Sequence, residues 1–473
     1  MPKNPGFGLR QVSSAINQRA ALGILACALT ALVYQSAFDL PFVFDDRTTV
    51  LLNPALVRVW DLPALARAWD VPGLSYAWDR ALWGFSSFGF HLTNFVLHVV
   101  VVGLFYGTCT RAFVDGARLR PSGASARQPP ASNQGLTPGV EWPAFFAAAV
   151  FGLHPLMSST ALYVSARSEM VCAAAFMIAL MFARRAILAS RRGSGLLAAA
   201  FGAVAVASSP AGAGLPIVLL VYDAWLLRTD GWRRRLARAY VPAMAIVAVV
   251  LGWRFYAADP SPTRLLQNVL TESIVAWRYL ALVVVPVREA IVHHSRWVES
   301  LADPVALLSV AGIGALIAAA IRLRRTAPLV SVGVIWFFAG IAATSTIVPQ
   351  RDLMAEPRVY LSAAGLIFAV FAAAAPYLAA RRAPRIAATA ILAVLVVLTV
   401  MRIRVWSDPL LLWTEAVERS PGSWLAHLEF SEALKEAGQC DRAVTEFAAA
   451  RDRNAQVPPE PVTGWAPCPR PLR

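Results

Sequence analysis

Two adjacent aspartates, Asp45 and Asp46, follow the first long apolar segment of the sequence. A carboxylate at the surface of a membrane can take a proton from an acceptor hydroxyl. If this segment is extended, neighbouring side chains point to opposite faces, so one aspartate would meet the substrate and the other would orient a partner. We expect Asp45 to be the base, because it lies nearer the apolar run and partial desolvation raises the proton affinity of a carboxylate. The structural alternative is that the pair only begins a turn.

Further ionisable residues lie near the ends of apolar segments, where a charge is costly and is therefore a functional candidate. Arginine suits a phosphate, because its planar guanidinium binds oxygen pairs, and histidine or a carboxylate suits proton transfer. We expect these groups to meet on one side of a membrane. The candidates for binding a donor phosphate or another part of a substrate are Arg80, His91, His154, Arg167, Glu169, Glu356 and Arg358.

Some of these candidates also have a purely structural interpretation. His91 and His98 are seven residues apart, share one helix face, and are more typical of packed core histidines than of metal ligands. Glu169 could simply lie at a helix N-terminus, where negative charge is favoured. His154 is expected about 12 residues into a helix, which places it roughly 18 Å along the helix axis. His293 and His294 have no acidic neighbours in the sequence and are expected on the surface.

The composition shows which kind of protein must position these residues. Of 473 residues, 58% are hydrophobic and 15% are charged, whereas soluble proteins have about 25% charged residues. A soluble multidomain enzyme is therefore excluded. The net charge of +15 comes from arginine clusters between long apolar runs, which is typical of membrane topology and not of nucleic-acid binding. The expected partner is a lipid bilayer, and no nucleic acid is expected.

Five arginine clusters define the expected topology, because basic residues stay on the cytoplasmic side. They begin at Arg111, Arg184, Arg228, Arg322 and Arg381. The sequence predicts eleven spans, with the N-terminus inside and the C-terminus outside. If the short apolar run 274–287, which we expect at the membrane surface, also spans, there are twelve. The predicted spans are 20–38, 92–113, 142–163, 169–186, 195–210, 213–228, 239–257, 303–321, 328–347, 359–380 and 386–402.

The chain divides into a polytopic membrane domain over 1–405, a short repeat segment over 406–456 and a Pro-rich disordered tail over 457–473. Within the membrane domain, 39–90 forms the first outer loop and 114–140 a disordered cytoplasmic linker. The repeat segment has a period of 34, typical of tetratricopeptide repeats. One and a half repeats cannot bury a core, so this segment must pack on the membrane domain or on a protein partner.

The cysteines predict no cofactor. No pair has metal-ligand spacing, so no metal site is expected, and a divalent cation is compatible with the sequence but not indicated by it. Cys440 and Cys468 in the C-terminal part would pair in an oxidising compartment.

Several motifs, taken in order, resemble the transmembrane and tetratricopeptide-repeat (TMTC) O-mannosyltransferases and their bacterial relatives. The motifs are Phe44-Asp45-Asp46-Arg47, Asn53-Pro54, Gly89-Phe90-His91-Leu92-Thr93-Asn94 with His98, His154-Pro155, Tyr163, Ser165, Arg167, Glu169, Thr344-Ser345, Val348-Pro349 and Glu356-Pro357-Arg358-Val359-Tyr360-Leu361.

The resemblance implies an all-α GT-C-type fold and an inverting glycosyltransferase in the bacterial inner membrane. Such an enzyme moves a sugar from a polyprenyl-phosphate carrier to a protein or other acceptor on the outer face. It implies a catalytic acid in the first outer loop, Asp45 or Asp46, and adds Tyr360 to the substrate-binding candidates. The Ser-Lys-Glu of relatives is replaced by residues 208–213, Ser-Ser-Pro-Ala-Gly-Ala. The alternative is therefore a non-catalytic membrane scaffold that keeps this fold. A transporter is disfavoured, because the ionisable residues gather at one boundary.

Overall fold

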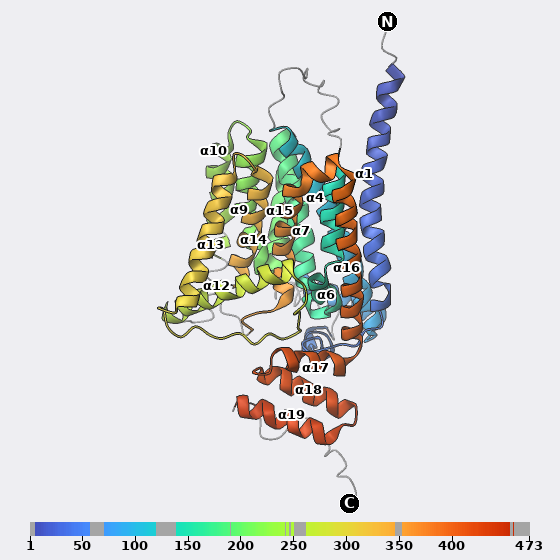
Figure 1. Ribbon diagram of the computed structural model, residues 1–473, viewed down its shortest axis with the longest axis vertical. Coiled ribbons are helices and arrows are strands. Elements are labelled where there is room, and N and C mark those ends of the chain that lie inside the picture. The colour runs from blue at the N-terminus through green and yellow to red at the C-terminus, as the bar shows by residue number, and fades with distance from the viewer. Residues whose placement is uncertain are drawn as a thin grey trace, which may run out of the picture.

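The computed structural model of the chain is a bundle of long helices with three further helices packed at one end (Figure 1). It describes residues 5–56, 71–119, 139–189, 191–241, 243–245, 247–249, 262–345, 352–454 and 457. All regular elements in these ranges are helices. The expectation of an all-α polytopic membrane protein is therefore confirmed.

Seven helical segments are long and apolar enough to cross a membrane, and a bent pair adds an eighth. Two shorter apolar helices, α8 (Arg192–Ser208) and α14 (Pro328–Ser345), lie at further predicted spans. Most of the predicted span 239–257 lies outside the described residues, so the number eleven stays a prediction. The seven segments contain α1 (Pro5–Tyr34), α4 (Ser87–Ala117), α7 (Arg167–Ala189), α9 (Leu215–Val221), α13 (Pro304–Leu323), α15 (Tyr360–Ala380) and α16 (Arg382–Ser407).

The predicted span 142–163 is two helices bent by 56°. They are α5 (Glu141–Gly152) and α6 (Pro155–Leu162). The bend has a local cause, because Pro155 lacks an N–H and cannot continue the helical hydrogen bonding. His154 has an extended backbone, and its side chain accepts a hydrogen bond from the Leu156 N–H, so it caps α6. The expectation that His154 lies within a continuous helix is therefore wrong.

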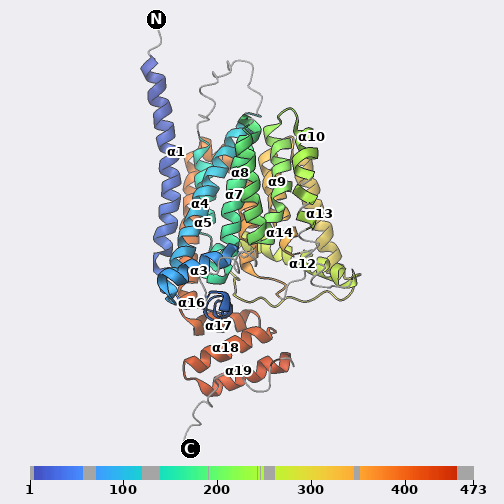
Figure 2. The ribbon, with the colours of Figure 1, turned by 180° about the vertical axis from the view of Figure 1, so that it is seen from behind.

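The two ends of the bundle differ in charge. The arginine clusters lie where α4, α7, α13 and α15 end and around α10 (Trp232–Arg235), at the end of the bundle that carries the chain's N-terminus (Figures 1 and 2). We call this the basic end. Some of these arginines satisfy helix termini: Arg385 donates to the carbonyls of Leu378 and Ala379 at 2.6 and 2.7 Å, which helix C-termini leave unpaired. The helix α4 continues to Ala117, so the predicted linker 114–140 begins too early, and 120–138 lies outside the described residues.

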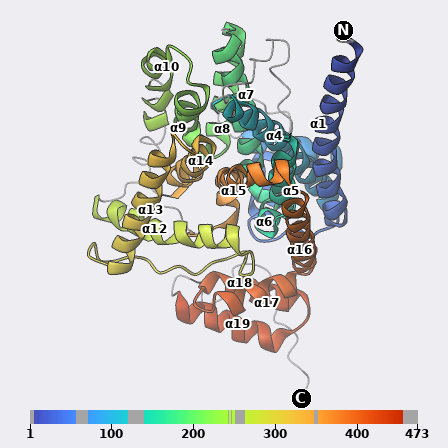
Figure 3. The same ribbon diagram turned by 45° about the horizontal axis from the view of Figure 1, so that its top comes forward.

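The opposite end of the bundle carries the first predicted outer loop and the C-terminal helices, and we call it the docking end. Here α3 (Val71–Trp83) packs beside α4 (Figure 2). The helix α12 (Pro262–Val284) runs across the bundle instead of along it (Figures 1 and 3). The helix α12 is not among the candidate spans. Its orientation agrees with the expected position of the run 274–287 at the membrane surface.

The C-terminal helices α17 (Pro409–Arg419), α18 (Trp424–Glu436) and α19 (Cys440–Arg453) pack against the docking end. Their shared core includes buried Trp413, which meets the ring of Phe44 edge-on at a centroid distance of 5.8 Å. A hydrogen bond joins the His294 N–H to the Ser420 hydroxyl at 3.1 Å, and an ion pair joins Arg47 to Glu436 at 2.7 Å. These helices thus rest on the membrane domain. Except for buried Val457, the predicted disordered tail 457–473 lies outside the described residues.

The linker joins the end of α4 to the start of α5 at the basic end, opposite the C-terminal helices, which predicts labelling of the linker and of these helices from opposite sides of the membrane. We expect a cysteine at Ser125, in the linker, to react with a membrane-impermeant maleimide only after the cells are opened. A cysteine at Thr445, which is exposed on α19, should react in intact spheroplasts. Reaction of both positions from the same side would contradict the topology. The native cysteines Cys27, Cys109 and Cys172 are at least partly buried and give a low background.

Candidate functional site

Asp46 is a buried carboxylate that ties the first loop to the start of α7. It accepts hydrogen bonds from the Ser165 N–H and hydroxyl at 2.7 and 2.6 Å, and from the Val43 N–H at 3.2 Å. Burial raises the pKa of Asp46 to about 7, although the hydrogen bonds from Ser165 and Val43 partly oppose this rise. Because both oxygens are occupied, Asp46 positions the loop and does not face a substrate.

Asp45 is exposed, although we expected it to be the more desolvated of the two aspartates. The segment turns at this point, with Phe44 at a φ of +51°, instead of running extended. The backbone N–H of Asp45 donates to the Tyr163 hydroxyl at 3.2 Å. The two side chains do lie in different environments, but the sequence assigned burial to the wrong one, because the turn folds Asp46 inward onto Ser165.

Arg167 is fully buried at the docking end and has several polar partners. Its guanidinium pairs with Asp79 at 2.6 Å and donates to the Asn94 side chain at 2.7 Å and to the Phe90 carbonyl at 2.9 Å. It also lies 4.5 Å from the ring centroid of Tyr76. Arg167 therefore joins α3, α4 and α7 and is not available to a phosphate. The sequence did not indicate its partner, because Asp79 lies 88 residues earlier in the chain.

The histidine and tyrosine candidates also hold the fold together. His154 hydrogen-bonds through Nε2 to the Val283 carbonyl at 3.0 Å, which connects α6 to the end of α12. Tyr360 is buried and its hydroxyl lies 2.7 Å from Nδ1 of His98. His91 is buried beside the ring of Phe42, at a centroid distance of 6.4 Å. These three candidates are thus part of the packing, which is the structural interpretation given above for His91.

Arg80 and Arg358 are the two candidate arginines without an ion pair within the described residues. Arg80 stacks on the ring of Phe85, with its guanidinium carbon 3.8 Å from the centroid. Arg358 is half-buried, and its Nη1 donates to the Asp352 carbonyl at 2.6 Å. Arg358 is also near enough to Glu169 for the two charges to interact. Donors of Arg358 therefore remain for an anionic ligand.

Glu169 is buried beside residues 208–213, the segment that has Ser-Ser-Pro-Ala-Gly-Ala in place of the Ser-Lys-Glu motif. The Ser209 hydroxyl lies 3.0 Å from each oxygen of the Glu169 carboxylate. Gly212 is required beside it, because a Cβ at this position would meet the carbonyl carbon of Ala205 at 2.5 Å. The segment of Gly212 therefore packs closely on α8, and Ser209 in this segment contacts the Glu169 carboxylate. The serine of the motif thus has a partner, while no lysine is present in this segment.

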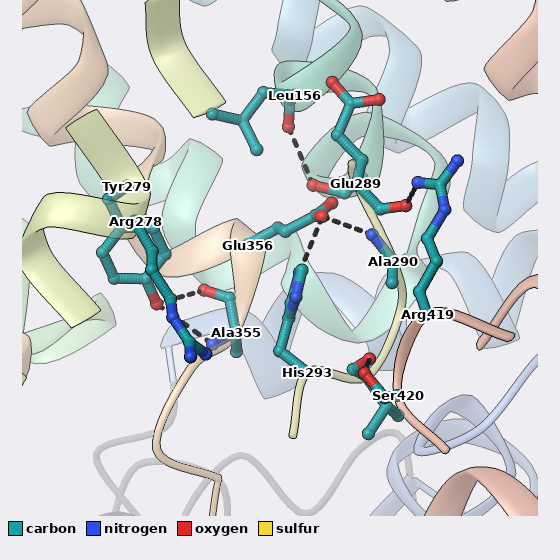
Figure 4. A network of polar contacts seen from close by, with 12 residues as sticks. Leu156, Arg278, Tyr279, Glu289, Ala290, His293, Ala355, Glu356, Arg419 and Ser420 are labelled. Carbon is teal, nitrogen blue, oxygen red and sulfur yellow. Dashed lines mark hydrogen bonds and ion pairs between the residues drawn. The ribbon is translucent and has the colours of Figure 1, made fainter. Parts of the chain in front are cut away.

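Glu356 lies at the centre of a buried acidic group next to the C-terminal helices (Figure 4). One oxygen accepts from the Ala290 N–H at 2.6 Å and lies 2.9 Å from Nε2 of His293. His293 is therefore a partner of Glu356 and not the surface residue that the sequence suggested. Glu289, which is also buried, is near enough to Glu356 for burial and the second carboxylate to raise its pKa.

Two arginines, Arg402 and Arg419, balance the charge of these carboxylates. Neither was among the predicted site residues. Arg402 is buried and pairs with Glu415 at 2.7 Å and with Glu289 at 3.7 Å. Arg419 pairs with Glu415 at 2.6 Å and donates to the Glu289 carbonyl (Figure 4). This network connects α16 and α17 to the loop after α12. In the sequence, the only sign of this network is that Arg402 and Arg419 come at and after the end of the last apolar run.

The described part of the chain contains no group of three histidine, cysteine or acidic side chains placed to hold a metal ion. No family model, curated protein or solved structure matches this chain. The predicted site residues at the docking end include an exposed carboxylate, Asp45, and a half-buried cation, Arg358. Together these groups could take a proton and hold an anion.

The raised pKa of Asp46 predicts a specific pH dependence of stability. Because the folded pKa, about 7, lies above the unfolded value of about 3.9, the native state binds the extra proton between these values. Its contribution to stability is therefore lost as pH rises from about 4 through about 7. The Asp46→Asn protein cannot ionise here, so its unfolding temperature in detergent should fall less between pH 5 and pH 8. Asp45→Asn is the exposed control and should follow the wild type. An unchanged pH dependence in Asp46→Asn would contradict the burial of an ionisable group.

The buried pair of Arg167 and Asp79 predicts a non-additive effect on stability. Arg167→Ala leaves the Asp79 carboxylate buried without its partner, which typically costs about 3–5 kcal/mol. The double change Arg167→Met with Asp79→Leu removes both charges and should recover much of this loss. Thermal unfolding of the purified proteins measures both effects. A double variant as unstable as the sum of the single variants would show that the pair is not coupled.

Proposed function

We propose that this protein is a membrane glycosyltransferase that moves a sugar from a polyprenyl-phosphate carrier to a hydroxyl of a protein or another acceptor. One observation supports it most: Asp45 is exposed, and Arg358 contacts a carbonyl but no carboxylate in the described residues, at the same end of the bundle. Asp46, Arg167, Glu169 and Glu356 have internal hydrogen bonds or ion pairs. The GT-C-type fold is part of the proposal and is supported by the resemblance of the motifs and the all-α bundle.

The proposed roles of Arg358 and Asp45 follow from the exposure of their side chains to a ligand. Arg358 binds the phosphate of the donor with its free donor groups, as a guanidinium does well. Asp45 accepts the proton of the acceptor hydroxyl, whose oxygen forms a bond to the anomeric carbon. The bond from that carbon to the phosphate oxygen breaks, and the carrier phosphate leaves with the electron pair. Attack from the opposite face inverts the configuration of the sugar.

An amphiphilic donor suits the surroundings of Arg358. The Tyr279 hydroxyl of α12 donates to the Ala355 carbonyl at 2.8 Å, which places α12 beside the segment of Arg358. The end of α12 and the following residues expose apolar side chains: Val284, Val285 and Val287. A polyprenyl chain could lie on this apolar surface while its phosphate reaches Arg358.

The proposed location is the bacterial inner membrane, with the docking end in the periplasm. The arginine clusters at the opposite end support this orientation through the positive-inside rule. Cys440 is in a disulfide, a bond that persists in oxidising compartments such as the periplasm. Cys468 lies outside the described residues. The helices α17–α19 would then meet a protein acceptor or partner outside the cytoplasm.

The second candidate function is a non-catalytic scaffold, and the internal bonding of the motif residues favours it. Asp46, Arg167, His154 and Tyr360 have internal hydrogen-bond partners. The motif could thus be kept for the fold alone. Measured sugar transfer would exclude this alternative.

Substitution of Arg358 and Asp45 should separate donor binding from transfer. We expect Arg358→Lys to weaken binding of a polyprenyl-phosphate sugar, because a point charge replaces a planar fork, and Arg358→Ala to weaken it further. Asp45→Asn should keep donor binding and lose about 10²–10⁴-fold in transfer rate, the usual contribution of a general base. Both quantities are measured with purified protein in proteoliposomes.

Arg278→Ala is the matched control, because Arg278 is an exposed arginine at the same end that also donates to a carbonyl, that of His294. It should leave binding and transfer unchanged. Unchanged donor affinity in Arg358→Ala would exclude Arg358 as the phosphate ligand. Full transfer by Asp45→Asn would exclude Asp45 as the base. No transfer by the wild type with any polyprenyl-linked donor would favour the scaffold.

A further inference from the structure

A pocket of about 480 Å³ lies between α1, α4 and α7 at the basic end, opposite the candidate site. Its lining residues belong to three candidate spans, near the ends that carry arginine clusters, where we expect a bilayer surface. Four arginines from all three helices line it: Arg19, Arg111, Arg118 and Arg184. A pocket with this lining selects an anionic ligand.

Two acids hold the arginines of this pocket in place. Asp115 is buried and accepts two hydrogen bonds from Arg184, at 2.5 and 2.6 Å. It also accepts from the Tyr222 hydroxyl at 2.8 Å and from Arg118 at 3.4 Å. Arg19 lies 3.9 Å from Glu141. Because Asp115 is shared and fully buried, it orients the guanidinium groups but is not itself offered to a ligand.

Arg111 adds a positive charge that is in no ion pair with Asp115 or Glu141. Its Nη1 donates to the Gly107 carbonyl at 2.8 Å, and no ion pair of Arg111 is found within the described residues. Arg111 lies one turn of α4 before Asp115 and belongs to the pocket lining. Its other N–H donors are therefore suited to phosphate oxygens.

An apolar surface continues from the pocket along α1. Ile24 and Leu25, about one turn after Arg19 and Ala20, are 69% and 44% exposed. The helices α1 and α4 are close here, because a Cβ on Gly23 would meet the Tyr106 ring at 2.8 Å. A ligand with a phosphate and hydrocarbon chains would satisfy both the arginines and this surface.

We propose that the pocket binds the phosphate headgroup of an anionic phospholipid, with its acyl chains along α1 and α4. Basic pockets between transmembrane helices bind lipid headgroups in this way. A free phosphate ion shares the headgroup chemistry but makes no use of Ile24 and Leu25. The site is independent of the proposed sugar transfer, because it lies at the other end of the bundle.

The test is binding of dioleoyl phosphatidylglycerol to the full-length protein in neutral micelles, measured by native mass spectrometry. We expect Arg111→Gln to weaken binding about fivefold, the usual effect of one basic residue near an anionic lipid. Arg118→Gln, whose side chain is 43% exposed and thus tolerates replacement, should have a similar effect. Arg185→Gln is the matched control, because Arg185 is exposed on α7 and does not line the pocket.

Phosphatidylcholine with the same acyl chains and inorganic phosphate distinguish the ligand sources. The proposal predicts tighter binding of phosphatidylglycerol than of phosphatidylcholine, with no displacement by millimolar phosphate. Equal binding of the two lipids, or wild-type affinity in both Arg111→Gln and Arg118→Gln, would overturn it. Complete displacement by inorganic phosphate would show a simple anion site and would also overturn it. An equal loss in Arg185→Gln would place the effect outside the pocket.

Discussion

The exclusion of charge from the apolar middle of the helix bundle determines where most charged side chains of the described residues lie. A buried charge is costly unless it is paired and hydrogen-bonded. In the described residues the charged side chains therefore gather at two ends, and several that are buried there are paired, as with Arg167 and Asp79 or Arg184 and Asp115. The helices α3, α4 and α7 meet at the first pair. The loops around the candidate site depend on this arrangement.

The same constraint explains why most of the motif residues are structural. At the docking end the chain must pass between helices through loops whose polar groups cannot all reach water. Asp46 accepts three hydrogen bonds and His154 caps a helix at a proline-induced bend, so each offsets a local cost of burial. Asp45 is exposed and Arg358 is half-buried, so a ligand at this end can reach both. The C-terminal helices cover the same end through Trp413, Arg402 and Glu415, so they would lie close to any acceptor.

The apolar runs and the arginine clusters allowed the all-α membrane class, several of the spans and the gathering of arginines at one end to be predicted from sequence. Hydropathy is a property of local sequence, which is why this part succeeded. The site was harder to predict, because its contacts join distant segments. Glu356 meets His293 across 63 residues, and Asp46 meets Ser165 across 119. The turn at Phe44 causes Asp46, and not Asp45, to be buried. The sequence pattern does not indicate this turn, because it predicts that the extended segment continues.

The central claim is that a lipid-linked phosphate binds at the docking end next to Arg358. Its most direct test is cross-linking of a polyprenyl-phosphate sugar that carries a photoreactive group beside the phosphate, followed by mapping of the labelled peptides. The account predicts labels in the segment 352–360 and at the end of α12, reduced by an excess of unlabelled donor. Labels confined to the basic end, or labels that the unlabelled donor does not compete away, would contradict it.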